Sequence, residues 1–353
     1  MSKYIVTGGG TGGHLYPGLM IAEELAADGE VLYIASRNGI DHQIISGQDI
    51  GFEVRYWDLR GFTRSFALSA IIRNLVTLFK LFVVSIRSII LLIKFKPDTV
   101  IGVGGYISFP LVFFGKLVGA KTVIHEQNSF PGVTNRQLGK RVNTVMATYQ
   151  SSRKYFDPKK IIMTSNPRID IASQYVGKKF YEITEMDPNR CNILIVGGSL
   201  GAEAINDCII ELAKITPDKD FYLVCGNRYF LEYKDLNIPN LKVIAYLDQP
   251  FEYFATSDVV VSRAGATTLL ELIAMEKLTV AIPSPNVVAN HQLTNAQEFS
   301  RECMIKLIRE ENLDLEVISN VINDIIENKD NYIANIQKNK PNNAMEKILE
   351  ICK

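Results

Sequence analysis

Short apolar runs that end in glycine recur along the chain and predict buried strands. The first covers residues 3–7 and leads into "GGGTGGH" at residues 8–14. A helix is expected over residues 15–27 and a second strand over residues 31–35. Continuous apolar runs, rather than alternating ones, are typical of parallel strands that helices cover on both faces. The order strand, glycine loop, helix, strand therefore predicts a doubly wound α/β domain.

The same layout restarts in the second half of the chain at "NILIVGGSLGA" (192–202), where Gly197 follows Gly8 by 189 residues. Further strands are expected at 98–103, 121–125, 221–225, 241–245, 258–262 and 279–282. A chain of 353 residues exceeds one ordinary core, which also favours two domains. We predict domains at residues 1–163 and 164–339, with "TSNPR" (164–168) as the connector.

Residues 60–96 combine many apolar side chains with seven cations and no acid. Arg73, Lys80, Arg87 and Lys94 recur every seven residues, which keeps them near one side of a helix. The longest charge-free run is eight residues, whereas a spanning helix needs about 20 apolar residues with few charges. We therefore expect an interfacial helix whose four cations meet an anionic membrane surface. The alternative is a buried helix of the α/β domain with a solvated basic edge.

Composition and charge exclude several classes of function. The formal net charge is zero, which indicates no nucleic-acid partner. The five cysteines never stand in C-x-x-C spacing, which favours reduced thiols of a cytosolic protein, and the pattern after Met1 predicts no signal peptide. The four histidines are not at metal-ligand spacing, so we expect no metal site.

The glycine loop at residues 8–14 is suited to an anionic ligand, because glycines allow close approach and the following helix offers free N–H groups. A tight strand-to-helix turn is the alternative. His14 stands in the first turn of that helix, where an imidazole can accept a proton near neutral pH. It could equally hydrogen-bond a neighbouring strand end.

Other polar side chains fall at expected strand ends, where ligands bind in doubly wound sheets. They are His125, Glu126 and Asn128 in the first domain, and Ser199, His291, Gln292 and Asn295 in the second. Glu271 lies about two helical turns beyond Gly265, which follows another strand. A nicotinamide dinucleotide is a further possibility, because Gly8, Gly10 and Gly13 satisfy G-x-G-x-x-G. However, the strand end at residues 33–39 lacks the ribose-binding carboxylate, so Arg37 could serve only a 2′-phosphate.

Six motifs together resemble the bacterial UDP-N-acetylglucosamine transferases of peptidoglycan synthesis, over essentially the whole chain. They are "GGGTGGH", "GVGGYISFP", "HEQNSFPGVTN", "GGSLGA", "SRAGATTLLE" and "NHQLTNA", in the order and approximate spacing of that family. The resemblance implies a GT-B fold of two Rossmann-like domains and an inverting, metal-independent transfer. It also implies that the last helix, 340–353, packs back on the first domain.

The implied donor is UDP-N-acetylglucosamine, and the implied acceptor is muramoyl pentapeptide on undecaprenyl diphosphate, whose 4-hydroxyl is glycosylated. The first domain would meet the acceptor and the cytoplasmic face of the membrane as a peripheral protein, and the second would hold the donor. A complex of cell-wall synthesis proteins is a further implied partner.

Carried over motif by motif, the resemblance makes His14 the expected base, with His125 and Glu126 as the other catalytic candidates. The acceptor side is expected to include Gly104, Gly105, Tyr106 and Asn135. The donor contacts are expected at Thr11, Gly12, Gly13, Asn128, Arg168, Ser199, Leu247, Ala266, Thr267, Thr268, Leu269, Leu270, Glu271 and Gln292.

The chain departs from the family pattern at three places. Leu200 stands where glutamine is usual, Phe109 stands where glycine is usual, and "SNPRID" is one residue short of N-P-x-R. Two other functions remain open at this point. One is a related enzyme with a different acceptor, and the other is a non-catalytic binder of nucleotide sugars at the membrane.

Overall fold

The computed structural model describes residues 1–353 except 48, 64, 66, 199–200 and 288–289. The chain forms two compact units. The N-terminal unit comprises Met1–Arg168 together with Asn343–Lys353, and the C-terminal unit comprises Ile169–Asn342. The boundaries expected from the sequence differ from these by five residues at the connector and by three before the last helix.

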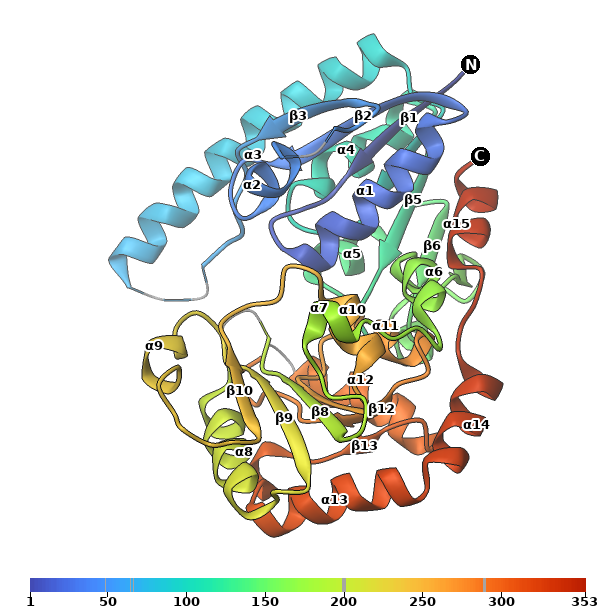
Figure 1. Ribbon diagram of the computed structural model, residues 1–353. Coiled ribbons are helices and arrows are strands. Elements are labelled where there is room, and N and C mark those ends of the chain that lie inside the picture. Colours follow the sequence, from blue (N-terminus) through green and yellow to red (C-terminus); the bar gives the residue numbers. More distant parts are fainter. Residues whose placement is uncertain (48, 64, 66, 199–200, 288–289) are drawn as a thin grey trace. The chain divides into compact units, whose positions relative to one another are not determined.

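The N-terminal unit is built on a seven-stranded sheet in which every pair of neighbouring strands is parallel (Figure 1). The strand order is β3 (Glu53–Trp57), β2 (Gly29–Ser36), β1 (Ser2–Thr7), β4 (Thr99–Gly102), β5 (Lys121–Glu126), β6 (Thr144–Ala147), β7 (Ile161–Met163). From β1 the chain continues to β2 and β3 on one side of the sheet, and it then returns to add β4 on the other side of β1. The direction in which strands are added therefore reverses between β1 and β4. Ligands bind at the carboxyl ends of such a pair in doubly wound sheets.

Helices cover both faces of this sheet, which explains its continuous apolar strands. Successive side chains of a strand point to opposite faces. Tyr4 and Val6 therefore pack with α1 (Gly12–Ala26) and α2 (Asp41–Ile45), whereas Ile5 packs with the helices of the other face. Those helices are α3 (Leu68–Phe95), α4 (Ser108–Gly115) and α5 (Val133–Leu138).

The C-terminal helix α15 (Ala344–Cys352) belongs to the N-terminal unit. Ile348 and Cys352 are fully buried in the same cluster as α1, and the Thr99 hydroxyl donates to the Cys352 carbonyl at 2.9 Å. An ion pair between Lys353 and Asp28 closes the end of the helix. The apolar spacing of the last residues is therefore explained by packing against α1.

Helix α3 presents an unusually apolar exposed face. Ala70, Thr77, Val84 and Leu91 are buried at seven-residue spacing, so one stripe of the helix packs on the unit. The opposite stripe is exposed and consists of Ile72, Leu75, Phe79, Phe82, Ile86, Ile90 and Ile93. By length and composition alone, Ser69–Phe95 could cross a membrane. Only 28% of its most apolar 18-residue stretch is buried within the protein. The spacing of the charged residues, however, predicts an interfacial helix.

The C-terminal unit repeats the architecture with a six-stranded parallel sheet. Its order is β10 (Leu241–Ile244), β9 (Lys219–Val224), β8 (Cys191–Val196), β11 (Val259–Ser262), β12 (Leu278–Ala281), β13 (Lys306–Leu307). Its helices are α6 (Arg168–Ala172, beginning at the last residue of the N-terminal unit), α7 (Tyr181–Thr184), α8 (Glu203–Ile215), α9 (Phe230–Tyr233), α10 (Pro250–Thr256), α11 (Ala266–Ala274), α12 (His291–Arg301), α13 (Leu315–Glu327) and α14 (Lys329–Asn339).

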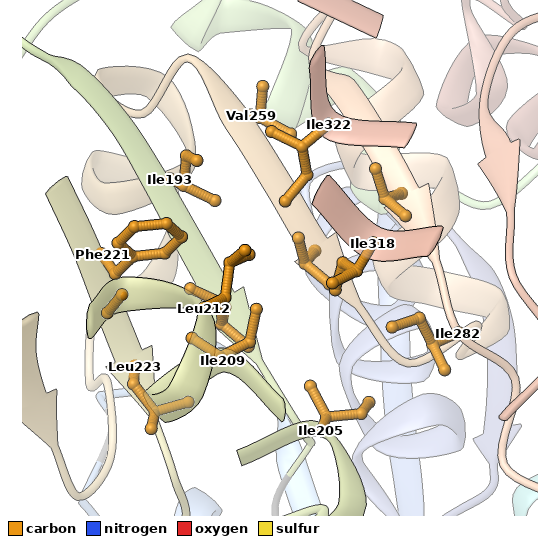
Figure 2. Packing of buried hydrophobic residues seen from close by; sticks show 14 of the residues in the cluster. Ile193, Ile205, Ile209, Leu212, Phe221, Leu223, Val259, Ile282, Ile318 and Ile322 are labelled. Atoms are coloured by element: carbon orange, nitrogen blue, oxygen red, sulfur yellow. The ribbon is translucent and has the colours of Figure 1, made fainter. Parts of the chain in front are cut away.

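One face of this second sheet is covered by α8 and α13 (Figure 2). Ile205 and Ile209 of α8 and Ile318 and Ile322 of α13 pack on Ile193, Phe221, Leu223, Val259 and Ile282. The doubly wound fold expected from the sequence is thus confirmed, with strands close to the predicted ranges. Helix α1 begins three residues earlier than predicted, and the sequence analysis missed β3, β6, β7 and β13.

The buried position of α15 predicts that Ile348→Ala lowers the free energy of unfolding of the N-terminal unit by about 2–5 kcal/mol, the usual range for a large-to-small core change. The exposed Glu350→Ala provides a control on the same helix and should change it by less than about 0.5 kcal/mol. Urea denaturation measures both. Equal midpoints for the two variants would contradict the packing of α15.

Candidate active site

The carboxyl ends of β1 and β4 open into a cavity of about 350 Å³, which we call the N-terminal cavity. This is the point in the first sheet where the chain order reverses, the usual ligand position of the fold. Both glycine loops, one after β1 and one after β4, reach it. Its lining is Gly9, Gly10, Thr11, His14, Ser36, Asn38, Gly39, Leu59, Arg60, Gly61, Gly105, Tyr106 and Ile107.

The two glycine loops pack so closely that side chains cannot be accommodated between them. A Cβ atom at Gly105 would lie 2.6 Å from the Gly9 carbonyl oxygen, and one at Gly104 would lie 2.5 Å from Cδ2 of His14. Gly104 and Gly105 also have positive φ angles, 106° and 80° respectively, which other residues rarely adopt. The second loop therefore fixes the place of the His14 ring.

A buried carboxylate, that of Asp41, binds the backbone of the first glycine loop. Asp41 is fully buried and accepts hydrogen bonds from the N–H groups of Gly10 at 2.7 Å and Ser36 at 2.9 Å. Burial raises the pKa of Asp41, and these two hydrogen bonds oppose that shift. The Gly10 N–H, which an anionic ligand could otherwise use, is thus already bound to Asp41.

His14 is half-buried in the first turn of α1 and lines the N-terminal cavity. Thr11 occupies the N-cap position, but in the described structure its hydroxyl makes no capping bond and instead lies 3.0 Å from Nδ1 of His14. Burial lowers the pKa of His14 from 6.5 to about 4, so the ring is neutral at neutral pH. A neutral ring whose Nδ1–H donates to Thr11 leaves Nε2 free to accept a proton.

The other two catalytic candidates are enclosed within the N-terminal unit. His125 is fully buried with Nε2 2.8 Å from the Ser165 carbonyl oxygen, and burial lowers its pKa to about 4. Glu126 is also buried and accepts from the N–H groups of Asn128 at 2.9 Å and Gly132 at 3.1 Å. Burial raises the pKa of Glu126, and its hydrogen bonds oppose the shift. Neither side chain lines the N-terminal cavity.

The remaining candidates of this unit occupy varied positions. Asn135 is buried and donates to the His125 carbonyl and to Glu126, both at 3.0 Å, so it braces the end of β5. Tyr106 is 39% exposed on the cavity. The Arg168 guanidinium lies over the ring of Tyr16, 4.9 Å from its centroid, and thus on the helix that carries His14. Asn128 is half-buried beside Glu126.

The C-terminal unit has its own cavity, of about 710 Å³, at the corresponding reversal point between β8 and β11. We call it the C-terminal cavity. Its lining includes Gly197, Gly198, Gly201, Arg263, Gln292, Glu203, Asp207, Tyr229, Ser284 and Glu310. The Gln292 side-chain oxygen accepts from the Ser284 N–H at 2.9 Å, and Arg263 pairs with Glu310.

Most of the other expected donor contacts in this unit are not among the residues that line the cavity. Ser199 lies outside the described residues, as does Leu200. Leu247 is buried, and Ala266, Thr267, Thr268, Leu269, Leu270 and Glu271 form the first turns of α11. Leu269 and Leu270 point into the core and Glu271 is 5% exposed. Among the expected donor contacts of this unit that the structure describes, Gln292 lines the C-terminal cavity and the others do not.

Sequence reasoning missed several residues of both cavities. In the first, Asn38 and Leu59 carried no signal, and Arg60 was counted only among the cations of the basic stretch. In the second, Arg263 stood inside a quoted motif, but its pairing with Glu310 depends on residues 47 positions apart. Among the described residues, no group of three or more His, Cys, Asp or Glu side chains could hold a metal ion.

Family models match both halves of the chain. The glycosyltransferase family 28 N-terminal domain matches residues 4–147, and the family 28 C-terminal domain matches residues 192–350. The structure of MurG from Acinetobacter baumannii superimposes over 100% of this chain and 99% of its own, with a TM-score of 0.78 at 24% identity. A UDP-GlcNAc 2-epimerase from Neisseria meningitidis aligns with a TM-score of 0.68 at 18% identity, covering 99% of each chain. These likenesses show the GT-B fold.

Relatives at higher identity share one description. The UDP-N-acetylglucosamine--N-acetylmuramyl-(pentapeptide) pyrophosphoryl-undecaprenol N-acetylglucosamine transferase of Flavobacterium psychrophilum is 34% identical over 99% of this chain and 96% of its own length. The transferase of the same description from Bacillus pumilus is 35% identical over 93% of this chain and 91% of its own. The chain therefore belongs to glycosyltransferase family 28, among the N-acetylglucosamine transferases of this description.

Proposed function

We propose that the chain transfers N-acetylglucosamine from UDP-N-acetylglucosamine to the 4-hydroxyl of muramoyl pentapeptide on undecaprenyl diphosphate, which converts lipid I to lipid II. The description of its relatives supports both substrates. The observation that carries the mechanism is the placement of His14 on the N-terminal cavity with Thr11 on its Nδ1. In the reaction the acceptor oxygen forms a bond to the anomeric carbon as the bond to UDP breaks.

His14 takes the acceptor proton in this proposal. Of the three catalytic candidates, it is the one that lines a cavity, whereas His125 and Glu126 are enclosed by protein hydrogen bonds. Burial lowers its pKa, which keeps the ring neutral, and the Thr11 hydroxyl lies where it can accept an Nδ1 proton in the tautomer that leaves Nε2 as the base. His125 and Glu126 then have a structural role, because their hydrogen bonds hold the connector and the loop after β5 in place.

The donor is assigned to the C-terminal unit. Gly197, Gly198 and the start of α8 line this cavity and offer backbone N–H groups suited to a diphosphate. Arg263 lies at the same cavity, where it is paired with Glu310. Gln292 reads sugar hydroxyls in this proposal, with Leu247 and Glu271 at the uridine. Negative charge on the departing UDP is thereby stabilised. An enzyme of the same family with another acceptor would share this donor site.

Helix α3 is proposed to hold the chain on the cytoplasmic face of the membrane. Arg73, Arg87 and Lys94 are exposed and lie at multiples of seven residues beside the apolar stripe, as an interfacial helix requires. A spanning orientation would place cations at mid-depth, which is costly. Lys80 differs from the other three because it is half-buried and pairs with Asp58. The expected lipid contact of Lys80 is therefore the weakest of the four.

Replacement of the proposed base provides the first test. His14→Ala should lower kcat at least about 100-fold, the usual scale of general-base catalysis, with the Kd for UDP unchanged. The exposed His42→Ala is the matched control and should retain full activity. A His14→Ala enzyme with wild-type turnover would remove His14 from the role of base.

The environment of His14 predicts its titration. Its pKa lies below the ordinary value of 6.5 because burial disfavours the charged ring, so the base form persists as the pH falls through 6. NMR of histidine-labelled protein should show the resonance that is missing in His14→Ala titrating near pH 4. Over pH 6–8, protonation of His14 should therefore not limit kcat/KM. A midpoint at or above 6.5 would contradict this environment.

The exposed cations of α3 predict salt-dependent binding to lipid. Replacement of Arg73, Arg87 and Lys94 by glutamine should weaken binding to anionic vesicles in sedimentation by about 100-fold, since each of the three cations near such a surface contributes about 1 kcal/mol. The loss should be larger at low salt. Lys80→Gln is the control with the smaller effect, and equal binding of the triple variant and wild type would overturn the membrane assignment.

A further inference from the structure

Residues 58–63, which we call the wall loop, connect β3 to the segment before α3 and form one side of the N-terminal cavity. Leu59, Arg60 and Gly61 line that cavity together with His14. Leu59 is 5% exposed and packs in the core cluster shared with α3 and α4. A Cβ atom at Gly61 would lie 2.2 Å from the ring of Tyr106, so the loop lies directly against this tyrosine.

One end of the wall loop is bound by a side chain of α3. The Asn74 Oδ1 atom accepts from the Thr63 N–H at 2.8 Å, and the Asn74 Nδ2 atom donates to the Thr63 carbonyl at 3.0 Å. A single amide thus satisfies both main-chain groups of one residue, as a neighbouring strand would. Asn74 is half-buried, which shields these two bonds from water.

The other end of the loop is bound to the same helix. Lys80, six residues after Asn74, forms an ion pair with Asp58 and lowers the pKa of that carboxyl. Asp58 also accepts from the side chain of Asn38, whose Oδ1 accepts from Arg60 at 2.8 Å. The chain of contacts therefore runs from α3 through Asp58 and Asn38 to a cation on the N-terminal cavity.

These contacts join α3, the helix proposed to bind lipid, to the N-terminal cavity. The exposed apolar residues Leu75, Val76 and Phe79 lie between Asn74 and Lys80 in the sequence of α3. We propose that Asn74 is a positioning residue. Its two bonds to Thr63 couple the placement of α3 on the membrane to the position of the wall loop, which lines the cavity assigned to the acceptor. This inference rests on the proposed function for the identity of the acceptor, but the contacts that carry it are independent of that function.

Asn74→Ala removes both hydrogen bonds and should raise KM for a short-chain lipid I analogue about tenfold, because the wall loop loses its attachment to α3 at Thr63. The Kd for UDP should not change. Ser85→Ala is the control on the same helix, because the Ser85 hydroxyl bonds only the Leu81 carbonyl within α3 among the described contacts. An unchanged acceptor KM in Asn74→Ala would overturn the positioning role.

A second readout needs no turnover. Trp57 is the only tryptophan of the chain, is half-buried and directly precedes the wall loop. In Asn74→Ala, acrylamide should quench Trp57 more strongly, and the Thr63 amide should exchange with solvent at least about tenfold faster. Vesicles of phosphatidylglycerol and phosphatidylcholine should reduce quenching in the wild type but not in Asn74→Ala, although both sediment equally.

The outcomes separate the inference from the proposed function. If Thr63 exchange and Trp57 quenching are the same in Asn74→Ala and wild type, Asn74 does not anchor the loop. If vesicles leave wild-type Trp57 unaffected, the coupling to the membrane is wrong. If the wild type glycosylates no lipid I analogue while both readouts respond as expected, the proposed acceptor fails and the anchor stands.

Discussion

The close packing of two glycine loops at the reversal point between β1 and β4 is the constraint on which the rest of the N-terminal site depends. Gly105 lies against the carbonyl of Gly9, and Gly104 lies against the ring of His14, so neither position can carry a side chain. Buried Asp41 holds the first loop from behind through Gly10. A half-buried, neutral imidazole is thereby kept at the wall of the N-terminal cavity, with the Thr11 hydroxyl 3.0 Å from its Nδ1.

Helix α3 connects this site with the lipid surface in the proposed function. One stripe is buried at seven-residue spacing, the opposite stripe is apolar and exposed, and Arg73, Arg87 and Lys94 lie at exposed positions. Asn74 and Lys80 face the wall loop instead. The same helix can therefore bind lipid with one face and shape the cavity with another. A lipid-linked acceptor is suited to such an arrangement, because its reactive sugar must be presented close to the membrane.

The fold could be predicted because its signals are local. Apolar runs that end in glycine identify β1, β4, β8 and β11, and the resemblance of six motifs points to His14. Burial and pairing could not be predicted, because they depend on residues distant in sequence. His125 and Glu126 share a strand end with Asn128, yet the structure encloses both. Asp41, Asn38 and Asn74 carried no signal, since their role arises only when α2, the end of β2 and the start of α3 meet the loops.

The most direct test of the account is transfer itself, measured with purified full-length chain, radiolabelled UDP-N-acetylglucosamine, a short-chain lipid I analogue and a chelator. The account predicts a β-linked disaccharide on the acceptor, formed at the same rate with and without the chelator. Tight UDP binding without any product on this acceptor would contradict the assigned reaction and leave only the donor site. The absence of UDP binding would contradict the account as a whole.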